Sequence, residues 1–355
     1  MFQTQLQHST KKDEMQTTQT LKQMIAGAWI TQGIYVVAQL GIADLLKDGS
    51  KSYDELATTT GVDARSLYRL LRALASVGIF AEGNSGYFEL TPVAESLRSD
   101  GCANAKGERT DSLRGYAIKS GQAWEWQPWG HLLESIKTGK PVFKNIFGME
   151  RFDYLATDPS ASKIYTQAIS SISGEQDAAI ASGYDFSSIH NLVEVGGGNG
   201  TLMASILKAN LTMQGILFDL PHVVADAKPV IENLGLQDRC QLVGGNFFES
   251  VPTGGDAYLL RYIVHDWDDE RAIAILKNCS QAMQPNGRLL LVEMVIPQGN
   301  EPFFGKLLDL QMLVNYGGRE RTEAEYQVLL ETAGFSLTKI YPVAPPISMI
   351  EAIRL

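Results

Sequence analysis

The chain has 355 residues, of which 45% are hydrophobic and 20% are charged, as in an ordinary globular protein with room for two domains. A net charge of -10 disfavours nucleic acid or an anionic membrane as the main partner. No apolar run is long enough for a membrane span, and residues 1–20 lack the apolar stretch of a signal peptide. We therefore expect a cytoplasmic protein with a mobile N-terminal tail. Three distant cysteines (Cys102, Cys240 and Cys279) show no metal-ligand spacing, so no metal site is predicted.

A helical domain is predicted over residues 21–110. An apolar-rich helix fills 21–40, a short helix follows over 42–46, and Ser52 with Glu55 forms a capping box for a helix over 53–59. A further helix over 64–77 precedes two short segments, 79–81 and 87–90, which flank a Gly-Asn-Ser-Gly turn and indicate a hairpin. Helix, turn, helix and hairpin predict a winged helix-turn-helix.

A DNA-binding role for this domain is disfavoured by its charge. Residues 21–100 carry seven basic and nine acidic residues, a net charge of 7 − 9 = −2, whereas a module that reads a duplex has a basic face. We predict instead that the domain packs against a partner subunit. A ligand-sensing transcription regulator stays open as an alternative that a gel shift would test.

The middle of the chain, residues 111–185, is predicted to be a helical linker. It is rich in large aromatic residues that include Trp124, Phe143 and Phe147. Each of these alone fits ordinary core packing, but their density before the next segment indicates the wall of a substrate pocket.

Strand and helix patterns alternate over residues 186–355, which predicts an α/β domain with a doubly wound parallel sheet. Strands are predicted at 191–195, 215–219, 240–244, 257–264 and 288–295, with a helix over 269–283. The last two strands, 335–341 and 347–355, have a connection too short for a parallel crossover. This pair is therefore expected to be antiparallel.

A glycine-rich loop follows the first of these strands, in the sequence V-E-V-G-G-G-N-G over 193–200. Glycines accept positive φ and let the backbone approach a ligand, and the helix expected from Thr201 adds free N–H groups. Asp219, about 20 residues further on, would accept hydrogen bonds from ribose hydroxyls. Thr201 stands where a dinucleotide fingerprint needs Gly or Ala, which disfavours an NAD-dependent oxidoreductase. The short loop and the terminal antiparallel pair favour S-adenosylmethionine.

Further motifs are F-D-L-P at 218–221, H-D-W-D-D at 265–269 and G-G-R-E-R-T at 317–322. With these, the chain from about residue 21 to its end resembles the S-adenosylmethionine-dependent O-methyltransferases that include plant caffeate and isoflavone enzymes and bacterial natural-product homologues. The segment Q-L-G-I-A-D-L-L over 39–46 resembles the dimerisation domain of that family. The resemblance implies a Rossmann-like class I sheet, a homodimer, S-adenosylmethionine as cofactor and no metal.

The resemblance also assigns binding residues. It places the cofactor at Glu194, Gly196, Gly198, Asp219, Leu220, Asn246, Phe247 and Arg261. Asn246 replaces the acid of the family's usual G-D-F-F, and its side-chain oxygen still accepts a hydrogen bond; Arg261 stands where lysine is frequent. The substrate pocket is predicted to include Trp124, Phe143, Phe147, Asp266, Leu308, Met312 and Asn315.

His265 is predicted to be the general base. It follows a strand at the carboxyl edge of the sheet, where open α/β sheets bind ligands, and its ordinary pKa of about 6.5 suits proton transfer. Glu293 near the end of the next strand could hold the imidazole, and Glu320 is the second candidate; both match the acids that flank the family's histidine. These residues predict methylation of a phenolic or enolic hydroxyl on a small aromatic substrate. Methylation at nitrogen, carbon or carboxylate on the same scaffold is the alternative.

Overall fold

The computed structural model describes residues 17–101 and 111–355. Two compact units make up the chain, Met1–Ala123 and Trp124–Leu355, and the division lies inside the predicted linker 111–185. Most of the predicted tail, and Cys102, lie outside the described residues, whereas residues 17–25 are helical. Within the described part, no helix is long and apolar enough to cross a membrane.

The N-terminal unit is helical with a small sheet. Its elements are α2 (Gly27–Leu40), α3 (Ile42–Leu45), β1 (Lys51–Ser52), α4 (Tyr53–Thr60), α5 (Ala64–Ala75), β2 (Phe80–Glu82), β3 (Tyr87–Leu90), α6 (Pro92–Glu95) and α7 (Arg114–Ser120). The predicted capping box of Ser52 and Glu55 is confirmed, and so is the antiparallel pairing of β2 with β3. Strand β1 pairs with β3 and was not predicted, because two residues are too few to show a period.

Large apolar side chains lie exposed along the first helical stretch of this unit. Leu21 is 59% exposed, Met24 71%, Ile25 66% and Trp29 76%. Apolar side chains gathered in this way mark surfaces that contact a partner.

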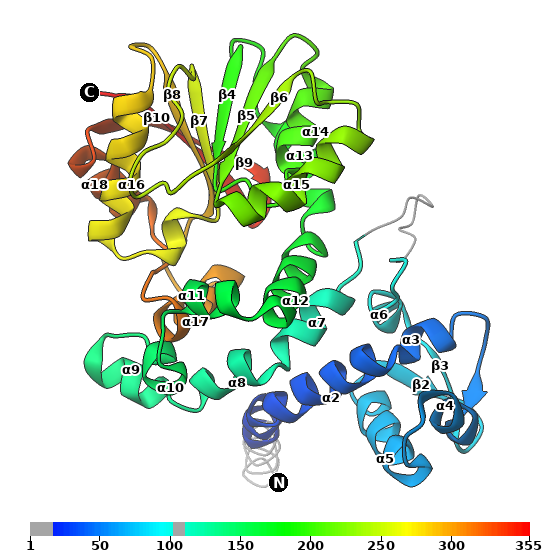
Figure 1. Ribbon diagram of the computed structural model, residues 1–355. Coiled ribbons are helices and arrows are strands. Elements are labelled where there is room, and N and C mark those ends of the chain that lie inside the picture. The colour runs from blue at the N-terminus through cyan, green and yellow to red at the C-terminus, as the bar shows by residue number, and fades with distance from the viewer. Residues whose placement is uncertain (1–16, 102–110) are drawn as a thin grey trace, which may run out of the picture. The chain divides into compact units, whose positions relative to one another are not determined.

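A seven-stranded sheet with the order β6-β5-β4-β7-β8-β10-β9 organises the C-terminal unit (Figure 1). Strands β4 (Asn191–Val195), β5 (Gln214–Asp219), β6 (Cys240–Gly244), β7 (Ala257–Arg261) and β8 (Arg288–Met294) run parallel to one another. The terminal pair, β9 (Phe335–Ala344) and β10 (Ile347–Arg354), is antiparallel. The predicted sheet with its antiparallel terminal hairpin is therefore confirmed.

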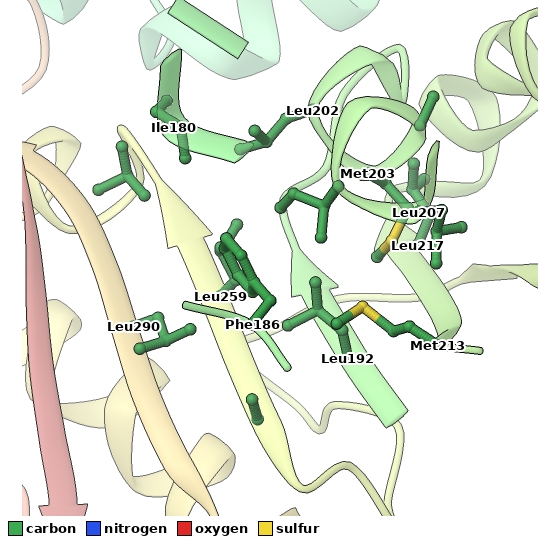
Figure 2. Packing of buried hydrophobic residues seen from close by; sticks show 14 of the residues in the cluster. Ile180, Phe186, Leu192, Leu202, Met203, Leu207, Met213, Leu217, Leu259 and Leu290 are labelled. Atoms are coloured by element: carbon green, nitrogen blue, oxygen red, sulfur yellow. The ribbon is translucent and has the colours of Figure 1, made fainter. Parts of the chain in front are cut away.

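Helices cover both faces of the sheet. Helices α13 (Gly174–Gly183), α14 (Thr201–Ala209) and α15 (Pro221–Asn233) pack on one face, and α16 (Asp269–Ala282) and α18 (Glu323–Thr332) on the other. Because side chains alternate along a strand, Leu259 of β7 enters the first cluster while its neighbours Tyr258 and Leu260 enter the second. Figure 2 shows Leu192, Leu259 and Leu290, from three neighbouring strands, in the first cluster with Met203 of α14.

The predicted helical segment is also present. It contains α8 (Ala123–Trp129), α9 (Leu132–Thr138), α10 (Phe143–Phe147), α11 (Arg151–Thr157) and α12 (Pro159–Ser170), and α17 (Phe304–Asn315) joins them from the C-terminal part of the chain. Trp124, Phe143, Leu155 and Ala161 form a small apolar cluster apart from the sheet. This cluster surrounds a charged residue, described below.

Candidate active site

His265 lies on a short 3-10 turn, Val264–Asp266 (η1), just past the carboxyl end of β7. The predicted strand 257–264 is too long, since β7 ends at Arg261 and Tyr262 adopts a φ of 52°. A tyrosine in this left-handed region costs about 1–3 kcal/mol and persists only where its surroundings enforce it. The Tyr262 ring stacks on the imidazole of His265, with centroids 5.2 Å apart and planes inclined by 30°. The strained residue therefore helps to fix the imidazole plane.

Three buried carboxylates surround the imidazole. Its Nδ1 lies 2.6 Å from Oε1 of Glu320 and 3.8 Å from Oε2 of Glu293, and its Nε2 lies 3.6 Å from Oδ1 of Asp266. Glu293 projects from β8 and its other oxygen accepts a hydrogen bond from the Val264 N–H at 3.0 Å. The structure thus brings together the three residues predicted to be catalytic, with Asp266 on the opposite side of the ring.

Charge around the ring decides its protonation. Burial lowers the pKa of His265, but Glu293, Asp266 and Glu320 raise it more, to about 10. Burial raises the pKa of Glu293 to about 8 and that of Asp266 to about 6. The site therefore favours an imidazolium paired with carboxylate, which is the state that a base reaches after it has taken a proton.

Arg321 connects two segments of the site, the loop with Glu320 and the turn with His265. Its fully buried guanidinium donates to the carbonyls of Val264 and Trp267, both at 3.1 Å, and to Asp269. Gly318 lies where the same loop contacts the turn. A larger residue would not fit there, because a Cβ would lie 2.1 Å from the His265 carbonyl oxygen. Sequence reasoning gave neither residue a role, although both lie within the G-G-R-E-R-T motif.

The glycine loop after β4 has the backbone that the sequence requires. Gly196 has a φ of 75° and Gly198 a φ of 56°, and a Cβ on Gly196 would lie 2.3 Å from Ile263. Asp219 at the end of β5 accepts hydrogen bonds from the N–H of Gly198 at 2.9 Å and of Leu220 at 2.7 Å. Its carboxylate, whose pKa is raised by burial, thereby holds the loop and keeps lone pairs for ligand hydroxyls.

Glu194 tests whether this loop suits S-adenosylmethionine. It is only 2% exposed, and its Oε2 has no hydrogen-bond partner within residues 17–101 and 111–355. Burial raises its pKa to about 8, and Asp177 adds to the rise while Arg261 opposes it. A buried acceptor of this kind is stabilised by a cationic donor such as the ammonium of an amino acid. The residues therefore fit a cofactor with an amino-acid end.

The remaining predicted cofactor residues occupy the same edge of the sheet. Arg261 forms an ion pair with Asp177 of α13 and donates to Gln176 at 3.1 Å. Asn246 follows β6 and its Oδ1 accepts from the Phe248 N–H at 3.0 Å. The Phe247 ring lies within 4.0 Å of the position that a Cβ on Gly196 would take, and Leu220 is 41% exposed. Their contacts with the cofactor stay predictions.

A pocket of about 330 Å³ lies beside His265. It is lined by Glu150, Arg151, Phe152, Asp153, Phe248, Asp266, Trp267, Arg271 and Tyr316.

Of the seven predicted substrate residues, Asp266 is in this lining. Trp124, Phe143 and Asn315 lie behind it, in contact with Arg151. Phe147 packs against Phe143 with tilted rings, Met312 is buried on α17 and Leu308 is half-buried there. Phe152 belongs to the aromatic set that indicated a pocket wall, whereas Arg151 and Tyr316 were missed because isolated residues form no motif.

Comparison with known proteins places the chain in a family. An O-methyltransferase domain matches residues 129–336, and an O-methyltransferase dimerisation domain matches residues 22–100. The chain belongs to the O-methyltransferase family. The resemblance drawn from its motifs is thus confirmed, and the N-terminal unit carries a dimerisation domain.

Relatives of this O-methyltransferase include bacterial natural-product enzymes. Phenazine O-methyltransferase PhzM of Lysobacter antibioticus is 43% identical over 94% of this chain and 95% of its own. A phenazine-1-carboxylate N-methyltransferase of Pseudomonas aeruginosa is 30% identical over 94% of this chain and 96% of its own. The crystal structure of LaPhzM has a TM-score of 0.88 at 43% identity, and covers 96% of this chain and 99% of its own.

The O-methyltransferase uses S-adenosylmethionine and needs no metal. One solved neighbour, NcsB1 from neocarzinostatin biosynthesis, was crystallised with S-adenosylmethionine and 2-hydroxy-5-methyl naphthoic acid; it has a TM-score of 0.79 at 32% identity and covers 92% of this chain and 96% of its own. Ligand atoms of His265, Glu293 and Glu320 lie within 4.8 Å of one another, close enough to hold an ion. In a metal-independent enzyme, the same cluster is available for proton transfer.

Proposed function

We propose that the enzyme, acting as a homodimer, transfers the methyl group of S-adenosylmethionine to a phenolic or enolic hydroxyl of a small aromatic natural product. The observation that carries the proposal is the imidazole of His265, held by Glu320 at 2.6 Å and flanked on its other nitrogen by a pocket residue, Asp266. Relatives named for phenazine, naphthoate and hydroxybenzoate substrates support an aromatic acceptor. The exposed apolar helix and the dimerisation domain support the homodimer.

His265 removes the proton that the acceptor loses. The cofactor supplies an electrophilic methyl group on a sulfonium sulfur. A neutral hydroxyl is a poor nucleophile, and Nε2 of His265 takes its proton as the new carbon–oxygen bond forms. Glu320 accepts from Nδ1–H and Glu293 lies beside it, so the imidazolium that results is stabilised. Burial of the whole cluster excludes water from the proton transfer.

Methylation at nitrogen is the competing function, because N-methyltransferases occur among the relatives. An aromatic nitrogen has a free lone pair and needs no base before transfer. A carboxylate acceptor would face the negative charge of Asp266 in the pocket wall. The buried imidazole with its carboxylates therefore favours a hydroxyl.

A panel of acceptors tests the proposed function. Phenols, naphthols, hydroxyphenazines, quinones, anilines and aromatic carboxylic acids are incubated with methyl-labelled S-adenosylmethionine, and the labelled carbon is located by NMR. Methyl ethers are the expected products. Labelled N-methyl, C-methyl or ester products with no ether would contradict the proposal.

Glu320→Gln is expected to shift the pH dependence of the reaction to lower pH. The neutral imidazole takes the proton, so kcat/KM for a phenol should rise with pH toward the His265 pKa of about 10. Glu320 raises that pKa by its charge and its hydrogen bond, whereas glutamine keeps the accepting oxygen without the charge. The rising limb should move down by about 1–2 pH units, since opposite charges at this range shift pKa values by that much.

The measurement is kcat/KM against pH at constant ionic strength. Glu323→Gln, an exposed acid at the start of α18, is the matched control and should keep the wild-type profile. An unchanged limb in Glu320→Gln would remove Glu320 from its role beside the base.

A further inference from the structure

A buried arginine lies in the wall of the pocket beside His265. Arg151 begins α11, is 2% exposed and lines the pocket together with Asp266 and Tyr316. Its guanidinium carbon lies 4.6 Å from the ring centroid of Tyr316 and 5.0 Å from that of Trp124, with Phe143 and Tyr165 at 5.5 and 5.8 Å. Aromatic faces attract a cation, so these rings hold the guanidinium in one place.

A chain of hydrogen bonds fixes this arginine further. Nη2 of Arg151 donates to Oε2 of Glu125 at 2.5 Å. Glu125 also accepts from the amide of Gln311, whose oxygen in turn accepts from the Trp129 indole N–H at 2.7 Å. Glu125 thus holds Arg151 directly, and Gln311 and Trp129 hold Glu125 in turn.

Arg151 also sets the orientation of Asn315. Its Nη1 donates at 3.1 Å to Oδ1 of Asn315, the last residue of α17. A guanidinium is only a donor, so the amide must turn its oxygen toward Arg151 and present its NH₂ on the other side. Asn315 therefore presents its NH₂, a donor, on the side away from Arg151.

Two donors in this cluster lack a partner. Nε of Arg151 and Nδ2 of Asn315 are both buried, and neither has an acceptor in the described part of the chain. A buried polar group without a partner is destabilising, and a bound acceptor restores the missing hydrogen bond. Arg151 lines the pocket and Asn315 lies directly behind it, so we take this acceptor to belong to a ligand in the pocket.

The charge of the cluster specifies what kind of acceptor fits. Glu125 neutralises Arg151 at 2.5 Å, and the carboxylate of Asp266 lines the same pocket. Arg151, Glu125 and Asp266 together carry no positive excess to offset the desolvation of an anion. An uncharged oxygen or nitrogen acceptor is favoured over a carboxylate.

We propose that Arg151 and Asn315 form a donor subsite that selects aromatic acceptors bearing an uncharged hydrogen-bond acceptor, such as a quinone or ketone carbonyl, away from the hydroxyl to be methylated. The inference rests on the proposed function for the identity of the hydroxyl. Arg151 is a specificity residue here, and it also positions the Asn315 amide.

Asn315→Asp tests the subsite, because it replaces the donating NH₂ by an oxygen of the same size and keeps an acceptor for Arg151. Three probes are compared: an acetylnaphthol, the parent naphthol and the corresponding hydroxynaphthoate, with the substituent on the ring remote from the hydroxyl. In the wild type we expect kcat/KM to be highest for the acetylnaphthol and lowest for the hydroxynaphthoate. Asn315→Asp should lower the acetylnaphthol value roughly 10- to 100-fold, the scale of an unmade buried hydrogen bond, and the naphthol value less than about threefold.

Binding separates failure of the subsite from failure of the proposed function. Calorimetry gives the Kd of each naphthol for enzyme saturated with S-adenosylhomocysteine, whether or not methyl transfer occurs. Asn233→Asp, an exposed asparagine at the end of α15, is the matched control, and melting temperatures show that each variant folds. Two results would contradict the proposed subsite. One is an equal loss of affinity for both naphthols in Asn315→Asp, and the other is that the wild type binds the hydroxynaphthoate most tightly. Selective loss for the acetylnaphthol would support it even if the methyl group were found on another atom.

Discussion

His265→Gln is expected to lower kcat for a phenol roughly thousandfold, because a positioned general base contributes about 10²- to 10⁴-fold to the rate. The glutamine amide fills similar space and cannot take a proton. Residual turnover should remain, since the cofactor and acceptor are still held together. Arg261 lies on β7, and the other predicted cofactor residues lie on or just after other strands; none is in the turn that carries His265, so the Kd for S-adenosylmethionine should stay within about twofold of the wild type.

Single-turnover rates with cofactor in excess measure the chemical step, and calorimetry measures cofactor affinity. His190→Gln is the matched control, because the His190 side chain is 75% exposed. Its turnover should equal that of the wild type. A near-normal rate in His265→Gln would exclude His265 as the base, and a large loss of cofactor affinity would assign the residue a binding role.

Asp219→Asn is expected to weaken cofactor binding roughly 30-fold, within the range of losing hydrogen bonds to a charged acceptor. The wild-type carboxylate accepts from the N–H groups of Gly198 and Leu220 and is predicted to accept from the ribose as well. Asparagine has one accepting oxygen, so it cannot hold the loop and bind the ribose equally well. At saturating cofactor, kcat should fall much less than affinity.

Calorimetric titration with S-adenosylhomocysteine gives the affinity, and a melting curve without ligand shows whether the loop alone has been weakened. Asp226→Asn, an exposed acid on α15, is the control and should bind as the wild type does. Unchanged affinity in Asp219→Asn would place the ribose elsewhere.

The sheet and its loop could be predicted because their signals are local. Apolar runs gave strands β4, β6 and β8 with bounds correct to within one residue, and the glycines of 196–200 marked a turn that L side chains cannot adopt. The placement of Glu293 and Glu320 around His265 also needed the family resemblance. A loop residue 55 positions away, such as Glu320, has no periodic relation to the imidazole.

The rest depended on contacts that a single sequence does not display. The segment Tyr262–Val264 is apolar and looks like a continued strand, but its left-handed φ at Tyr262 turns the chain, and apolar patterns contain no information about φ. Arg151 and Glu125 are distant in sequence and surrounded by aromatic residues, so neither appeared as a charge pair. The polar subsite behind the pocket could therefore not be predicted from the sequence, although the aromatic residues around it were predicted to line a pocket.

The most direct test of His265 as the base compares methyl transfer to phenols of graded acidity in the wild type and in His265→Gln. At about pH 9, where a fraction of His265 is neutral, a phenol with a pKa of about 10, like that of tyrosine, is still mostly un-ionised and needs a base, whereas an acidic nitrophenol is already ionised. We expect a deficit of roughly 10³-fold in the variant for the weak acid, and less than about tenfold for the ionised phenol. An equal deficit for every phenol would contradict the assignment of His265 as the base.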